Sequence, residues 1–177
     1  MTIRHPRRAA FLAAACLFVL LPWRAGAQAG AFDFHGLRMG MELPEITAAG
    51  YALRRGTDTP LSGAGWTVTG GLPPSLNAMT VYLFNHHLFQ IDVTFPPVRG
   101  EAAVAYVLQL RERYGAPVDE RFDPLRDAKW HWGGLTVHYS PGIRDDGRLF
   151  PNLLITDDAL YERAREMKER PPEGRGL

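Results

Sequence analysis

The chain has 177 residues, of which 20 are basic and 19 are acidic, so its formal net charge is +1. This balance, without a basic patch along the sequence, argues against a nucleic-acid partner. The length suffices for one compact hydrophobic core, and beyond the first 27 residues no segment is long and apolar enough for a transmembrane helix.

The first 27 residues have the order of a cleavable secretory signal. Three arginines precede an apolar run over residues 9–21, and small residues follow at 25–27. The apolar run is too short for a membrane span of about 20 residues. We therefore expect cleavage near Ala27 and a soluble periplasmic product. The Sec and twin-arginine routes, and full secretion, stay open as alternatives.

Removal of this segment would change the composition of the chain. The segment holds four of the 20 basic residues and none of the acidic ones, which leaves 16 basic against 19 acidic residues and a net charge of −3. It also holds Cys16, the single cysteine, so the exported chain would have no disulfide, thiolate ligand or thiol nucleophile. We expect no cofactor.

The first half of the exported chain has the pattern of a helix followed by antiparallel strands. Pro44 and Gly50 mark the start and end of a short helix. Brief strands are expected over residues 51–55 and 66–70, and the clearest hairpin covers residues 78–97.

Alternation of apolar residues predicts the register of that hairpin. The alternating residues are Met79, Val81 and Leu83 on the first arm, and Phe89, Ile91, Val93 and Phe95 on the second. A three-residue loop pairs Leu83 with Phe89 and puts both rows on one face, whereas a two-residue loop pairs Leu83 with Leu88 and separates them. We therefore predict the three-residue loop, with His86 and His87 at an exposed tip.

The other face of this hairpin carries two aromatic residues. Tyr82 and Phe84 alternate with the core residues and therefore point away from the core. An aromatic pair at that position would either anchor a protein partner or lie under a neighbouring loop. Both interpretations stay open, and Tyr82 and Phe84 are the candidate partner-binding residues.

The second half opens with the most regular helix of the sequence, over residues 100–114, which Gly115 and Pro117 should end. Its apolar stripe consists of Ala103, Val107, Leu110 and Tyr114, widened by Val104 and Leu108. A strand over residues 118–122, a polar loop over residues 140–152 and a helix over residues 157–169 are expected to follow.

Residues 130–140, WHWGGLTVHYS, predict a second hairpin. Gly133 and Gly134 form its two-residue turn, because both central positions need a positive φ. Alternation then places Trp130 and Trp132 in the core. The wetter face receives Lys129, His131, Thr136 and His138.

His131 and His138 are the candidate metal ligands, because diagonal neighbours on one face of a hairpin come within chelating reach. Zinc needs a third ligand and usually a fourth, and no nearby His or acidic residue has a matching spacing. We predict no metal site and solvent-facing histidines. Ser62 and Ser140 lie in turns without a nucleophile elbow or a recognisable base, so we also predict no enzymatic activity.

Two short motifs resemble those of exported assembly proteins. Residues 36–46, GLRMGMELPEI, are similar to the opening of the small outer-membrane assembly lipoproteins, and residues 110–117, LRERYGAP, to the helix-end signature of that group. A helix before an antiparallel meander, twice in one exported chain, also resembles the tandem fold of β-lactamase inhibitor proteins. Over residues 32–168, the resemblance implies this architecture and a binding module.

We therefore predict an α+β protein made of two similar units, each a helix packed on an antiparallel β-meander, with a C-terminal helix. The signal peptide covers residues 1–27, the first unit residues 28–97 and the second unit residues 98–169. Residues 170–177 are expected to be a disordered tail.

The predicted function is that of an exported, non-catalytic module that binds another envelope protein or assists envelope assembly. A face of the sheet, or the loops over residues 56–65 and 140–152, would hold the partner. The alternative is a metal-dependent or small-ligand-binding protein, or an enzyme, that uses His131 and His138.

Overall fold

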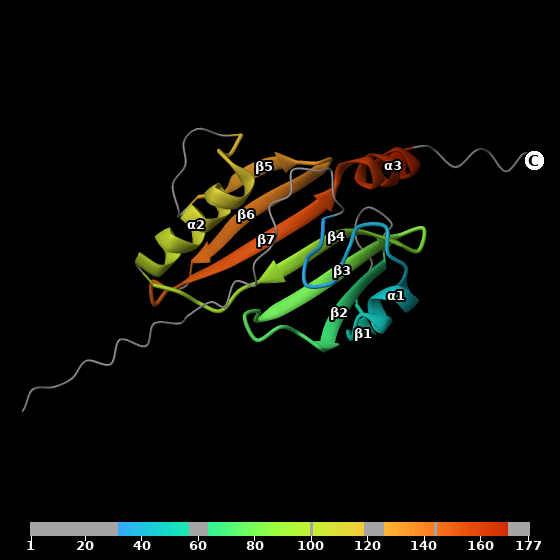
Figure 1. Cartoon of the computed structure of the whole chain (residues 1–177), viewed down its shortest axis with the longest axis horizontal. Coiled ribbons are helices and arrows are strands. Elements are labelled where there is room, and N and C mark those ends of the chain that lie inside the picture. Colours follow the sequence, from blue (N-terminus) through green and yellow to red (C-terminus); the bar gives the residue numbers. More distant parts are fainter. Residues whose placement is uncertain (1–31, 57–63, 100, 119–125, 144, 170–177) are drawn as a thin grey trace, which may run out of the picture.

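The computed structural model describes residues 32–56, 64–99, 101–118, 126–143 and 145–169. The expected signal peptide and tail, and nearly all of the strand expected over residues 118–122, lie outside this part. The described residues form an α+β fold with one seven-stranded antiparallel sheet and three helices (Figure 1), which confirms the predicted fold class. Among them, no helix is long and apolar enough to span a membrane.

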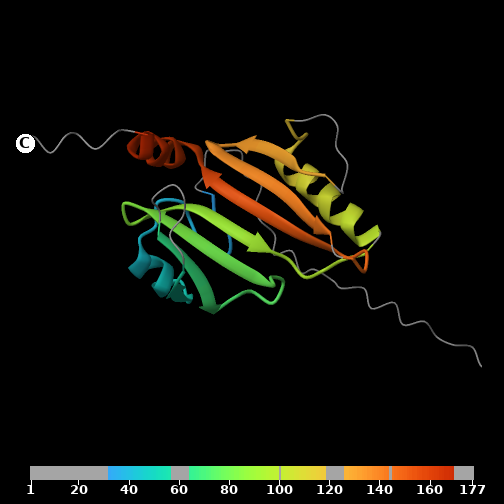
Figure 2. The ribbon, with the colours of Figure 1, turned by 180° about the vertical axis from the view of Figure 1, so that it is seen from behind.

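The elements follow one another in the order α1 (Leu43–Ala48), β1 (Ala52–Arg55), β2 (Ala64–Gly70), β3 (Ala78–Phe84), β4 (His87–Thr94), α2 (Glu101–Tyr114), β5 (Ala128–Trp132), β6 (Leu135–Ile143), β7 (Leu149–Asp157) and α3 (Asp158–Glu169). Across the sheet the strand order is β1-β2-β3-β4-β7-β6-β5, so β4 and β7 meet in its interior (Figure 2). The last strand of the chain therefore joins the two halves of the sheet.

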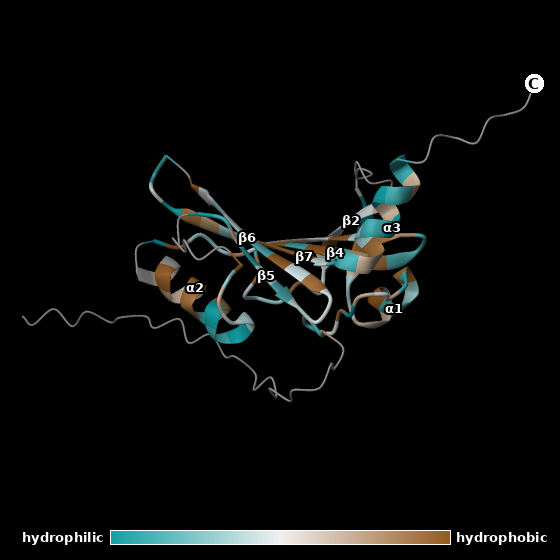
Figure 3. Cartoon of the chain, turned by 90° about the horizontal axis from the view of Figure 1, so that it is seen from above, coloured by the Kyte–Doolittle hydropathy of each residue, from teal (hydrophilic) through white to brown (hydrophobic). Residues whose placement is uncertain are grey.

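The hydrophobic core lies on one face of the sheet, where alternate strand residues are apolar. Helices α1 and α2 cover this face, through Ile46 of α1 and Val107 and Leu110 of α2. Helix α3 lies on the opposite side of the sheet (Figure 3), where Ala164 packs against Phe84 and Phe89.

Helix α2 buries a narrower stripe than the sequence predicts. Val107, Leu110 and Tyr114 are buried, but Val104 and Leu108 are exposed, and the side chain of Ala103 lies outside the described part. The expected widening of the stripe is wrong because α2 meets the sheet along one row, and no described element covers its outer side. Its end at Gly115, with a φ of +83°, is as predicted.

The β3–β4 hairpin has the predicted core face but a different turn. Val81 pairs with Ile91 as expected, yet Leu83 pairs with Leu88 across a two-residue turn at 85–86. A β-bulge absorbs the extra residue of β4, so Ile91 and Val93 still share the core face with the β3 row, but Leu88 takes the core position predicted for Phe89, which packs with Phe84 on the opposite face. The predicted three-residue loop is therefore wrong. His87 belongs to β4, and its Nδ1 lies 3.1 Å from the carbonyl oxygen of Gly40.

The β5–β6 hairpin has the predicted register, from Trp132 opposite Leu135 to Lys129 opposite His138. Gly133 and Gly134 both have positive φ values, as a two-residue turn of this kind requires. Trp130 is only 1% exposed, but Trp132 is 40% exposed. Burial of Trp132 is a wrong prediction, because it lies beside the turn, where Phe32 and Tyr114 contact its ring edge-on.

The predicted polar loop over residues 140–152 is instead the end of a long hairpin. Strand β6 continues to Ile143, which pairs with Leu149 at the start of β7. Alternate residues of β7, Leu149, Leu153 and Ile155 among them, are buried on the core face. An apolar strand thus begins immediately after the Asp-Asp-Gly turn, and the turn residues obscured it in the sequence.

Candidate functional site

The face of the sheet opposite the core is polar, and we call it the open face. Within the described part of the chain, only α3 packs on it, beside the β3–β4 turn. The register aligns its side chains in three rows across the strands. The rows are Arg54, Thr67, Thr80, Asp92, Leu154, His138 and Lys129; Tyr82, Gln90, Thr156, Thr136 and His131; and Thr94, Asn152 and Ser140.

The two candidate partner-binding residues lie on the same side of the sheet as the open face, but at the end that α3 covers. Phe84 is only 5% exposed and packs with Phe89 and Ala164. Tyr82 is half-buried against the same cluster. The sequence left open whether a neighbouring segment covers the two side chains, and the segment that covers them is helix α3. A role of these two residues in partner binding stays a prediction.

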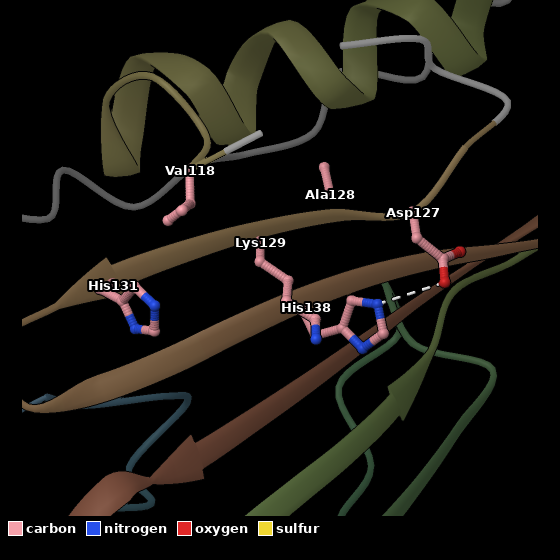
Figure 4. A pocket seen from close by; sticks show the side chains of 6 residues that line it. All are labelled: Val118, Asp127, Ala128, Lys129, His131 and His138. Atoms are coloured by element: carbon pink, nitrogen blue, oxygen red, sulfur yellow. Dashed lines mark ion pairs between the residues drawn. The ribbon is translucent and has the colours of Figure 1, made fainter. Parts of the chain in front are cut away.

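The two candidate metal ligands line one hollow at the β5 edge of the open face (Figure 4). The hollow has a volume of about 540 Å³ and is lined by Val118, Asp127, Ala128, Lys129, His131 and His138. Lys129 lies directly opposite His138 in the register and between the two imidazoles in Figure 4. An ammonium group at this position disfavours the binding of a cation by both rings.

His138 pairs with Asp127 at the rim of the hollow. Its Nε2 lies 3.4 Å from Oδ2 of Asp127, in an ion-pair contact without hydrogen-bond geometry. The Ser140 hydroxyl donates a hydrogen bond of 3.0 Å to Oδ1 of the same carboxylate. Ser140 therefore places its proton on a carboxylate rather than on an imidazole, which is not the arrangement that activates a serine nucleophile.

His131 is oriented by a chain of two hydrogen bonds. The Thr136 hydroxyl donates to Oδ1 of Asp158 at 2.7 Å, and Nδ1 of His131 lies 3.0 Å from the same hydroxyl oxygen. Because Thr136 has given its one proton to Asp158, the ring must donate from Nδ1. In the neutral ring, the lone pair is then on Nε2. The His131 side chain is 63% exposed, so this nitrogen is accessible to solvent.

These contacts give each histidine one orienting partner but no shared ligand set. Nowhere in the described ranges do three or more His, Cys, Asp or Glu side chains lie close enough together to hold a metal ion. The sequence correctly predicts that the hairpin carries His131 and His138 on one face. It did not predict the accompanying carboxylates, because Asp158 belongs to α3 and reaches the hairpin only in the folded chain.

We expect zinc to bind this hollow only weakly. Two imidazoles with a lysine between them lack the three protein ligands of a catalytic zinc site. Calorimetric titration of the tag-free protein should give a dissociation constant weaker than about micromolar, the level that corresponds to roughly 8 kcal/mol. The double variant His131→Ala/His138→Ala should fold normally. Stoichiometric binding at or below that level, lost in the double variant, would contradict this expectation.

The middle of the open face holds a second set of side chains, which we call the central patch. It consists of three polar residues and one leucine: Asp92, Thr94, Asn152 and Leu154. Asp92 lies opposite Leu154, and Thr94 lies opposite Asn152, on the paired strands β4 and β7. Burial raises the pKa of the Asp92 carboxyl above its usual range. The Oδ1 atom of Asn152 is buried and has no hydrogen-bond partner in the described chain.

Sequence reasoning missed the central patch altogether. Asp92 and Thr94 were simply the polar members of an alternating strand, and Asn152 fell in an expected loop. A buried acceptor without a donor becomes visible only when the neighbouring strands are in place.

Comparisons with known proteins do not contribute to the interpretation of this site. No protein-family model, curated protein or solved structure matches the chain.

Proposed function

We propose that this chain is a non-catalytic module that binds another protein across the open face of its sheet. One observation carries the proposal: three rows of mostly half-buried polar side chains extend over the strands, and α3 covers only one end of them. The opposite face has α1 and α2 packed on it. A broad, rigid surface on paired strands suits recognition of a partner with little conformational change.

The contacts around the histidines favour binding over catalysis. The hydroxyl of Ser140 is bonded to Asp127, and that of Thr136 to Asp158, so neither is poised against an imidazole base. His131 and His138 each have a carboxylate within 4.0 Å, and the hydroxyl that lies beside His131, that of Thr136, donates its proton to Asp158 rather than to the ring. These groups are better suited to polar contacts with a partner.

We further propose that the protein acts in the cell envelope after export. The support is the sequence of residues 1–27, in which arginines, an apolar run and small residues follow in the order of a cleavable signal. The partner is then another envelope protein. This assignment agrees with the resemblance of residues 36–46 and 110–117 to envelope assembly proteins.

Connectivity supports an arrangement of two similar units over residues 28–97 and 98–169. Helix α1 precedes a meander of four strands, and α2 precedes a meander of three strands. The last strands of the two meanders, β4 and β7, pair with each other. Two such units placed side by side give one continuous sheet. The open face is then a joint surface of both units, as in a tandem binding module.

A second candidate function is the binding of a small ligand in the hollow beside β5. The observation that favours it is the convergence of His131, His138 and Lys129 with Asp127 on one open space. The zinc titration described above tests the metal form of this alternative.

Photo-crosslinking tests the main proposal. A benzophenone amino acid is introduced at Leu154, in the middle of the open face, and in a matched variant at Leu108, which is exposed on the outer side of α2. Both variants are expressed as the full chain in cells and irradiated. We expect one discrete adduct from Leu154 and none from Leu108. An adduct from Leu108 alone, or none from either position, would contradict the proposal.

A further inference from the structure

We infer that the central patch recognises a basic side chain, arginine above all, which the bound partner inserts between Asp92 and Asn152 across Leu154. The inference rests on the proposed function and specifies the chemistry of the partner at one point of the open face.

The first support is the carboxylate of Asp92. It is half-buried in the middle of β4, and no described residue donates a hydrogen bond to it or forms an ion pair with it. Its charge acts on Tyr82, whose pKa is raised by burial and by the nearby carboxylate. Partial burial of a carboxylate without a donor costs free energy. A group of this kind is compensated when a cation approaches it.

The second support is the amide of Asn152 on the adjacent strand. Its Oδ1 atom is buried and unpartnered within the described ranges, although the residue as a whole is only half-buried. Asn152 lies opposite Thr94, two pairs along from Asp92 and Leu154 and therefore on the same face. Same-face residues in this diagonal relation have Cα atoms about 7–8 Å apart. Two acceptors thus flank one apolar side chain, and neither has a donor.

The chemistry of these acceptors selects the occupant. A guanidinium group offers five N–H donors in a planar fork, and its aliphatic stem packs well on an apolar surface such as that of Leu154. Among the cationic side chains that share the open face, Lys129 and the histidines lie on the far side of β7 from Asp92, and Arg54 lies at the other end of the same row, on β1, three strands away. None of these cations forms an ion pair with Asp92, so its carboxylate is left for a positive group from outside.

A pair of small probes isolates this contact. The isotope-labelled full chain is titrated with N-acetyl-arginine amide and, as a neutral isostere, N-acetyl-citrulline amide, while backbone amide shifts are recorded. We expect saturable shifts at Asp92, Asn152 and Leu154 with the arginine probe. Its affinity should exceed that of the citrulline probe by about tenfold or more, because the ureido group of citrulline still donates hydrogen bonds but has no positive charge.

Two carboxylate variants complete the test. Asp92→Asn keeps the shape of the side chain and should reduce binding of the arginine probe by about tenfold or more. Asp145→Asn, which removes an exposed carboxylate in the turn between β6 and β7, should leave it unchanged. Asp92→Asn should fold at least as stably as the parent at neutral pH, because burial disfavours the ionised carboxyl and the amide carries no charge.

The results separate this inference from the proposed function. Equal shifts with both probes, or undiminished binding by Asp92→Asn, would overturn the basic-side-chain inference even if Leu154 still crosslinks to a partner. Arginine binding without any crosslinked partner would instead overturn the protein-binding proposal. A dimer of the parent chain that Asp92→Asn dissociates would show that the basic side chain comes from a second copy, and would overturn assignment to a different protein.

Discussion

Replacement of Trp130 by alanine is expected to lower the free energy of unfolding by about 3–5 kcal/mol, the usual cost of removing a large aromatic side chain from a core. Trp130 is 1% exposed and packs with Tyr114 of α2. Its Nε1 donates a hydrogen bond of 3.0 Å to the carbonyl oxygen of Gly115, at the end of that helix. The substitution therefore opens a cavity and removes the donor that holds the helix end. Urea denaturation followed by circular dichroism measures the effect.

Trp132→Ala is the matched control from the same hairpin. Trp132 is 40% exposed and makes edge contacts with Phe32 and Tyr114. Aromatic pairs of this kind contribute about 0.5–1.5 kcal/mol, so the loss should be well below that of Trp130→Ala. Equal losses in the two variants would refute the assignment of Trp130 as the core member of the pair.

Gly71→Ala is expected to destabilise the protein by roughly 2–5 kcal/mol, from two separate causes. Gly71 follows β2 with a φ of +76°, a conformation that costs about 1–2 kcal/mol for a residue with a Cβ atom. A Cβ atom there would also overlap the carbonyl oxygen of Gly50, where the chain passes from α1 to β1. The shifts needed to accommodate this overlap reduce the stability by about a further 1–3 kcal/mol. Thermal and urea unfolding of the purified variant measure the loss.

Gly147→Ala separates the two causes. Gly147 also has a positive φ, +73°, but a Cβ atom there would meet no other atom within 4 Å. Only the conformational cost of about 1–2 kcal/mol should then remain. If Gly147→Ala and Gly71→Ala lose the same stability, the close approach of Gly50 has no energetic role.

The parts of the fold that local chemistry determines were predictable. The Gly133–Gly134 turn requires positive φ at both positions, and it fixes the register of β5 and β6 without reference to the rest of the chain. The short helix α1 likewise lies between Pro44 near its start and Gly50 after its end. Each of these signals lies within a few residues of the structure that it specifies.

The errors concern features that tertiary packing decides. In the β3–β4 hairpin, a three-residue loop and a two-residue turn with a bulge both put Ile91 and Val93 on the core face, and they differ in whether Phe89 or Leu88 joins them, which depends on packing against α3 rather than on alternation. The exposure of Val104 and Leu108 depends on how α2 lies across the sheet, which helical periodicity does not specify. The extent of β7 and its pairing with β4 were not predicted, because pairing between strands so far apart in the sequence has no local signal.

The candidate site was predictable only in outline. Alternation placed His131 and His138 on one polar face, which is confirmed. The central patch depends instead on the absence of a donor near Asn152 and Asp92 in the described chain, and that depends on where α3 ends its coverage of the sheet. The lack of a hydrogen-bond donor is a property of the assembled sheet rather than of any short segment.

The interior position of β7 has a consequence for the order of events during synthesis. Strands β1 to β4 leave the ribosome early, but the strand that hydrogen-bonds to β4 ends at Asp157, near the end of the described chain. Until then β4 is an exposed edge with a row of unpaired backbone groups and the apolar residues Ile91 and Val93, features that favour aggregation. Strand β4 is thus protected from edge-to-edge association only once β7 pairs with it, which makes this pairing the step that ends the vulnerable stage of folding.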